Sequence, residues 1–74
     1  MKAIRTRYLS PTNFKGGRIK ASDGDGNFIT LSYDHSLDTA ENHEKTAHTL
    51  CSKMDWTGEL KGGWFRSEMY WVFV

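Results

Sequence analysis

The chain has one cysteine, one proline and no long hydrophobic run among its 74 residues. The single thiol, Cys51, excludes an intramolecular disulfide, and one Cys with three scattered His does not supply the ligand spacing of a structural zinc site. The longest apolar stretch, Met69 to Val74, is far too short to span a bilayer. The N-terminal MKAIRTRYLS has no apolar core of a secretory signal. We therefore expect a cytoplasmic protein that makes no use of a membrane.

A chain of this length forms one domain, residues 1–74, without room for a second core. The net charge is +1, but the first 35 residues carry +3 and the remainder −2. Such a total is not that of a strongly basic nucleic-acid-binding protein, so a nucleic-acid role would need a local patch. Aromatic residues are abundant in the C-terminal part, where they suit a small core or an interface.

Three N-terminal segments alternate apolar and polar residues and are predicted to be strands: Lys2–Leu9, Arg18–Ser22 and Phe28–Tyr33. The glycine-rich SDGDGN, residues 22–27, separates the last two of these segments, which are predicted to form a hairpin. The longer segment SPTNFKGG, residues 10–17, contains the only proline and is predicted to be a loop.

Residues Thr39 to Met54 are predicted to form the one helix, with Asp38 as N-cap and Glu41 completing a capping box. One stripe of this helix is apolar and is expected to face the sheet. It consists of Ala40, Ala47, Leu50, Cys51 and Met54, with His43 half-buried in the same stripe. The helix is expected to end near Asp55–Gly58, with Gly58 as the stop.

The C-terminal part is predicted to add two strands. Glu59–Phe65 contains Gly62-Gly63 and is expected to be an interrupted or bulged strand. Met69–Val74 has high β-propensity without polar alternation, which indicates a strand covered on both faces. The expected fold is therefore α+β: a small antiparallel sheet in the order β-β-β-α-β-β, with one helix packed on one face.

The segment SDGDGN also suggests a calcium loop, because Asp23, Asp25 and Asn27 fit the first ligand positions of an EF-hand. Phe28 falls where that loop requires glycine, and the flanking segments alternate as strands do. A hairpin turn explains the same composition, since its Asp-Gly and Gly-Asn pairs favour turns. A phosphate loop fits less well than a calcium loop, because no Gly-Lys-Ser/Thr follows and two carboxylates would repel a phosphate.

No motif indicates catalysis. In HEKTAH the two histidines, His43 and His48, are five residues apart rather than four, and on a helix they cannot share one metal ion. Cys51 is expected in the core, where a thiol behaves as a small hydrophobe. Asp34, His35 and Ser36 have the residue types of a catalytic triad, but adjacency in sequence does not supply its geometry. We expect no enzyme activity, no cofactor and no metal.

The remaining candidates are surfaces. If the apolar strand residues face the helix, then Arg5, Arg7, Arg18 and Lys20 share the opposite sheet face, with Phe28 near its edge. Such a face suits phosphates, an acidic protein surface or only solvent. The second candidate is the aromatic C-terminal part, where Trp64 and Tyr70 are expected as interface anchors. An exposed edge of the Met69–Val74 strand would pair with a second copy of the chain.

Several segments together resemble a family of short, mostly uncharacterised proteins of proteobacterial genomes, phages and mobile elements. They are TRYLSPTN, GGRIKASDGDGN, YDH, the NH of residues 42–43, KMDWTGEL and the closing VFV. The resemblance implies a role in phage or mobile-element biology, where small non-enzymatic inhibitors such as anti-CRISPR proteins occur. We therefore expect a protein-binding module that inhibits a host defence complex such as CRISPR-Cas. The partner would be a host protein complex or a nucleoprotein. The alternative is a nucleic-acid-binding module that uses the basic sheet face.

Overall fold

The computed structural model describes residues 3–74, which form five strands and one helix. Their bounds are β1 Ala3–Leu9, β2 Arg18–Ser22, β3 Phe28–Ser32, α1 Thr39–Met54, β4 Leu60–Phe65 and β5 Glu68–Phe73. The expected α+β fold is confirmed. Lys2, the expected first residue of the first strand, lies outside the described residues. Within the described chain, no helix has the length and apolarity needed to cross a membrane.

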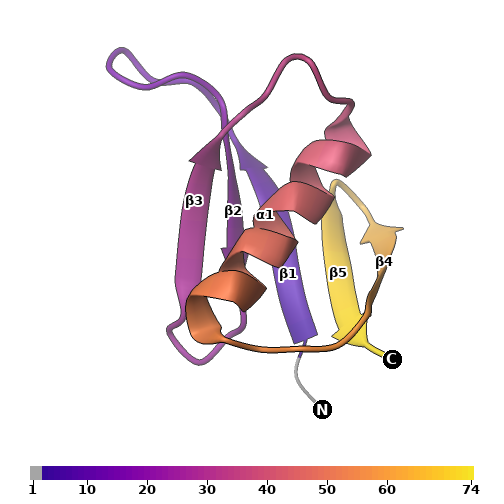
Figure 1. Ribbon diagram of the computed structural model, residues 1–74. Helices are drawn as coiled ribbons and strands as arrows, with labels where there is room; N and C mark the ends of the chain where they lie inside the picture. Colours follow the sequence, from indigo (N-terminus) through magenta and orange to yellow (C-terminus); the bar gives the residue numbers. More distant parts are fainter. Residues whose placement is uncertain (1–2) are drawn as a thin grey trace.

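All neighbouring strands are antiparallel, and their order across the sheet is β3-β2-β1-β5-β4. The first strand is therefore central: it pairs with β2 on one side and with β5 on the other. Helix α1 crosses one face of the sheet diagonally (Figure 1), and no helix of the described chain lies on the other face. That second, uncovered side is called the open face below.

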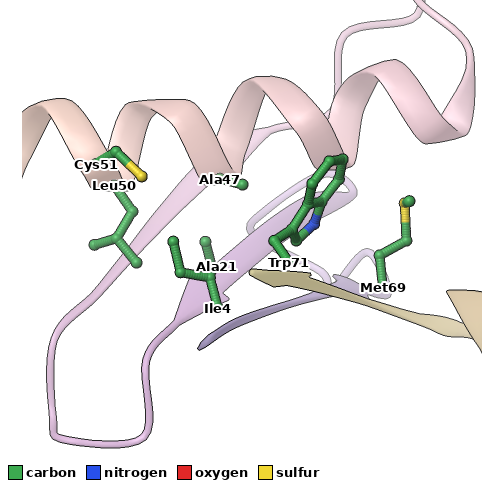
Figure 2. Close-up of a cluster of buried hydrophobic side chains, with 7 residues drawn as sticks. All are labelled: Ile4, Ala21, Ala47, Leu50, Cys51, Met69 and Trp71. Carbon is green, nitrogen blue, oxygen red and sulfur yellow. The ribbon is translucent and has the colours of Figure 1, made fainter. Parts of the chain in front are cut away.

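The core lies between the helix and the sheet. Figure 2 shows side chains of α1 meeting side chains of β1, β2 and β5. The members of this cluster are Ile4, Ala21, Ala47, Leu50, Cys51, Met69 and Trp71. The core position expected for Cys51 is thus confirmed, and burial raises the pKa of its thiol. A thiol in that state is mostly protonated at neutral pH and is a poor nucleophile.

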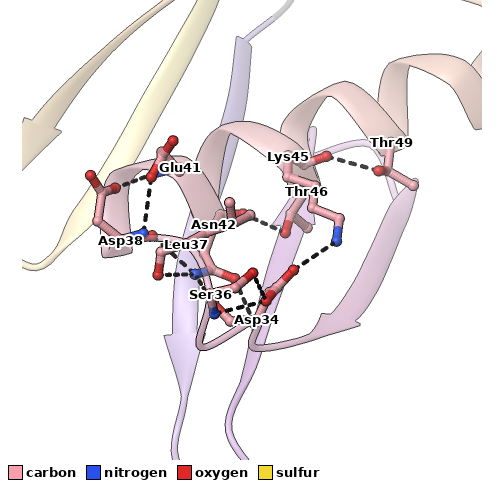
Figure 3. A network of polar contacts seen from close by, with 9 residues as sticks. All are labelled: Asp34, Ser36, Leu37, Asp38, Glu41, Asn42, Lys45, Thr46 and Thr49. Atoms are coloured by element: carbon pink, nitrogen blue, oxygen red, sulfur yellow. Dashed lines mark hydrogen bonds and ion pairs between the residues drawn. The ribbon is translucent and has the colours of Figure 1, made fainter.

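Helix α1 begins with the predicted capping box. The carboxylate of Asp38 accepts a hydrogen bond from the backbone N–H of Glu41, and the Glu41 carboxylate accepts one from the backbone N–H of Asp38. Asn42 attaches the preceding loop to the helix: its amide donates to the carbonyls of Asp34 and Asp38 and accepts from the N–H of Asp34 (Figure 3). These bonds fix the direction in which the chain enters the helix.

The buried side of α1 differs from the expected stripe. Ala40 is exposed, whereas Asn42 and Thr46 are buried and His43 is fully rather than half-buried. The polar residues tolerate burial because each has partners: Asn42 bonds the loop carbonyls, and the Thr46 hydroxyl donates to the carbonyl of Asn42. The helix ends at Met54 as expected, but its C-cap is Asp55 in the left-handed conformation, φ 58°, rather than Gly58.

The C-terminal hairpin corrects three expectations. Strand β4 is neither interrupted nor bulged, because Gly62 and Gly63 pair with β5 in continuous register. The Trp71 ring lies where a side chain on Gly62 would project, so that glycine makes room for the core. Strand β5 is covered on the helix side only. It lies between β1 and β4, so it offers no edge to a second copy; the outer strands are β3 and β4.

Candidate functional site

The open face is formed by alternate residues of all five strands, and it is rich in cations. The strand residues that lie on this face include five cations and a single carboxylate, Glu68. The cations are Arg5, Arg7, Arg18, Lys20 and Lys61. Because the whole chain has a net charge of only +1, the remaining surface is negative on balance. The molecule is therefore electrostatically two-sided.

The strand register brings the four predicted cations together. Arg7 is paired with Lys20 and Leu9 with Arg18 across β1 and β2, while Arg5 is paired with Ser22 one step further along. Directly opposite residues on neighbouring strands have Cβ atoms about 5 Å apart. The predicted grouping of Arg5, Arg7, Arg18 and Lys20 on one face is thus what the register produces.

None of these four cations forms an ion pair within residues 3–74. The Nε atoms of Arg7 and Arg18 are shielded from solvent and donate to no acceptor in the described chain. A buried donor without a partner costs free energy, about 1–3 kcal/mol. An anionic ligand on this face would meet the Arg7 and Arg18 guanidinium groups without competition from a carboxylate of the described chain.

Exposed aromatic rings flank the cations on both sides. Phe28, on the outer strand β3, is 51% exposed, and the Lys20 ammonium lies 4.7 Å from its ring centroid. On the other side, Tyr70 is 40% and Phe65 60% exposed, with their ring centroids 6.2 Å apart. The Tyr70 hydroxyl donates to Glu68, which places the one carboxylate at this aromatic end. The face therefore combines cations in its centre with π surfaces at its margins.

A hollow of about 330 Å³ lies at one end of this arrangement. Its lining includes Arg5 on β1, Tyr70 on β5, and Ser22, Asp23 and Gly24 at and after the end of β2. Arg5 and Tyr70 are directly paired across β1 and β5. The hollow thus offers a guanidinium and an aromatic ring from adjacent strands to one small ligand group.

Of the seven predicted contact residues, the open face contains six, and Trp64 lies elsewhere. Its position in β4 belongs to the helix side, where its ring is 5.0 Å from the ring of His43. Sequence reasoning missed Lys61 and Phe65 as members of the open face. The alternation of β4 carries that information, but the two glycines at its centre obscure it.

The other sequence motifs have structural roles. Ser22 pairs with Phe28, so SDGDGN is the predicted hairpin turn; the Asp23 carboxylate accepts the backbone N–H groups of Asp25 and Asn27. Ser36 donates directly to Asp34, so the order of a catalytic triad is not present. The hydroxyl and the backbone N–H of Ser36 both donate to the Asp34 carboxylate, and these two bonds, together with Lys45, lower its pKa. Within residues 3–74, no three His, Cys, Asp or Glu side chains are arranged to hold a metal ion.

Comparison of the chain with protein-family models, with curated proteins and with solved structures finds no match in any of the three. The resemblance to phage and mobile-element proteins therefore stays a prediction. Function is inferred below from the geometry of the molecule.

Proposed function

We propose that this chain is a non-catalytic binding module whose open face binds single-stranded nucleic acid. The observation that supports this most strongly is the group of four cations, which form no ion pair with another described residue and are held by the register between exposed aromatic rings. Proteins that bind single strands combine a positive surface for the backbone with aromatic side chains on which bases stack. An uncovered antiparallel sheet with aromatic residues is one known platform for such binding.

The spacing of the face suits a single strand that crosses the sheet. Phe28 and Tyr70 are in one row, separated by β2 and β1, so three strand spacings of about 4.8 Å place them about 14 Å apart. Arg5 lies between them in the same row. A strand running along this row would stack bases at both ends and meet guanidinium groups in between. Duplex nucleic acid presents no free base faces and would gain only the phosphate contacts.

The direct test is fluorescence anisotropy with a labelled fifteen-residue oligothymidine, measured from 50 to 300 mM salt. Four phosphate contacts predict a slope of about −3 in a plot of log K against log salt concentration. Arg7→Glu should weaken binding strongly. Lys45→Glu is the matched control, because it changes the net charge equally but lies on the exposed side of α1.

Two results would reject the nucleic-acid assignment. One is equal loss of affinity in the Arg7 and Lys45 variants, which would show that only net charge matters. The other is equal binding of polyglutamate to the same face, which would favour an acidic protein surface as the ligand. The second result would agree with the function expected from the sequence, inhibition of a host defence complex through protein binding. That function stays a prediction.

A further inference from the structure

Strand β4 is an outer strand, and its pairing with β5 shows which of its backbone groups are free. The carbonyl of Glu59 accepts from the N–H of Val74 at 2.9 Å, so this pair is a hydrogen-bonded one. Hydrogen-bonded pairs alternate along an antiparallel ladder. The N–H and C=O groups of Leu60, Gly62 and Trp64 therefore point away from β5, towards the free edge.

A groove of about 430 Å³ lies beside that edge, between helix α1 and strand β4. The residues that line it come from the first turns of the helix, from β4 and from the core beneath. They are Ala40, Glu41, Glu44, Glu59, Leu60, Lys61, Gly62, Met69 and Trp71. The groove exists because α1 packs mainly on β1, β2 and β3 and leaves the helix side of β4 only partly covered (Figure 1). Its floor is apolar, formed by Met69 and Trp71.

The charge of this groove is the reverse of that on the open face. Three carboxylates line it, those of Glu41, Glu44 and Glu59. Among the described residues that line it, Lys61 is the one cation, and its position in β4 has the alternation of the open face. The groove thus offers apolar contact below and negative charge at its rim, which complements a ligand with apolar and cationic groups.

The two outer strands differ in how their edges are protected. On β3, the Lys53 ammonium donates to the carbonyl of Phe28 at 3.1 Å. No described side chain hydrogen-bonds to the outward backbone groups of β4, and this strand has neither a proline nor a bulge. Trp64, half exposed on the groove side, adds an apolar surface beside it. An unprotected edge of this kind is a template for another strand.

We propose that the β4 edge and its groove bind an extended, cationic peptide segment of a partner protein by strand addition. The peptide backbone would pair with Leu60, Gly62 and Trp64. Alternate side chains would enter the groove, apolar ones over Trp71 and cationic ones towards Glu44. Strand addition beside a groove gives affinity through the backbone and specificity through alternate side chains. A second copy of this chain fits less well, because it would bring the same carboxylates to the interface.

This site is distinct from the open face, so the two proposals can fail separately. The probes are fluorescein-labelled seven-residue peptides in which lysine alternates with valine, leucine or tyrosine, together with counterparts that have glutamate for lysine. The full chain is titrated with each, and ¹⁵N chemical shifts locate the contact. Binding by the lysine peptides, with shift changes confined to residues 40–44 and 59–65, is the expected result.

Two further measurements test the mode of binding. Two sets of peptides are compared, with backbone N-methyl groups on the odd-numbered or on the even-numbered residues. Only every second N–H of the peptide pairs with β4, so one set should lose binding and the other should bind nearly as before. Glu44→Gln should weaken the lysine peptides about two- to fivefold, as expected for loss of a partly exposed charge pair. Ser52→Lys is the matched control: it also adds one unit of charge, but to a helix position that does not line the groove.

Four results would overturn the proposal. The first is a Kd above about 1 mM for every lysine peptide, and the second is equal binding by the glutamate peptides. The third is a set of shift changes centred on the open face, and the fourth is a concentration-dependent dimer that pairs through β4. The last result, measured by light scattering on the chain alone, would identify a second copy as the occupant of the edge.

Discussion

The hydroxyl oxygen of Thr6 lies 2.7 Å from Nδ1 of His43, and this buried contact joins the central strand to the helix. The same oxygen accepts a hydrogen bond from the indole N–H of Trp71 at 3.0 Å. The Thr6 hydroxyl has no other acceptor in the described chain, so its own proton is directed at Nδ1. In the neutral imidazole this direction assigns the remaining proton to Nε2.

Stability should fall when the solution is made mildly acidic. Burial lowers the pKa of His43 below its usual value of about 6.5, and the backbone of Thr6 offsets this effect only in part. The unfolded chain therefore takes up a proton more readily than the folded one. The free energy of unfolding should be nearly constant from pH 8 to about pH 6.5 and should fall below that, by at most about 1.4 kcal/mol per pH unit.

Urea denaturation at intervals from pH 8 to pH 5 measures this dependence. His43→Gln should flatten the profile in that range. His48→Gln is the matched control, because it removes an exposed imidazole from the same helix. If the slope persists in the His43 variant, another group is responsible.

Thr6→Val should destabilise the fold even though valine has a similar shape and is more apolar. The variant leaves Nδ1 of His43 and the indole N–H of Trp71 buried without a partner, at a cost of about 2 kcal/mol. Thr6→Ser retains the hydroxyl and should lose much less. Denaturant midpoints of the two variants decide the matter: a serine variant as unstable as the valine one would show that the methyl group, not the hydrogen bonds, is what counts.

The two glycines of β4 should respond oppositely to alanine. A Cβ on Gly62 would overlap the ring of Trp71, so Gly62→Ala should lower the free energy of unfolding by about 1–3 kcal/mol. Gly63 has open space at that position, and Gly63→Ala should be neutral or slightly stabilising, by up to about 0.5 kcal/mol. Thermal melts of both variants test this pair, and equal destabilisation would contradict the packing of Trp71 over Gly62.

Period-two alternation and capping chemistry were enough to predict most of this fold. The bounds of α1, its capping box and the pairing of β2 with β3 all depend on local sequence, which is why the basic residues could be assigned to one face in advance. The same reasoning failed where a tertiary contact decides. From sequence alone Asn42 is predicted to be exposed, because the loop carbonyls to which it donates are not known. Likewise Gly62 is predicted to interrupt its strand, because the position of the Trp71 ring over it is not known.

The edge strands show a second limit of the sequence. Met69–Val74 has the composition of a strand that needs cover, but composition does not say whether the cover is a neighbouring strand or another layer. In the structure β1 and β4 pair with its two edges, while its open-face side, including Tyr70, remains accessible. The free edge belongs instead to β4, whose glycines and mixed polarity made it the least certain strand. The α1–β4 groove could not be predicted either, because it depends on the angle at which the helix crosses the sheet.

Substitutions of cations and of aromatic residues on the open face should weaken nucleic-acid binding in different ways. Arg7→Gln removes a phosphate contact and should reduce the magnitude of the salt slope by about 0.7. Tyr70→Leu removes a stacking surface and leaves the charge unchanged. It should lower the affinity for oligothymidine by about 1–3 kcal/mol at every salt concentration, with the slope unaltered. Tyr70→Phe loses the bond to Glu68 but retains the ring, and should bind nearly as the parent does. An acidic protein ligand has no base to stack, so equal binding by the leucine and phenylalanine variants, with only Arg7→Gln impaired, would show that the face recognises negative charge alone.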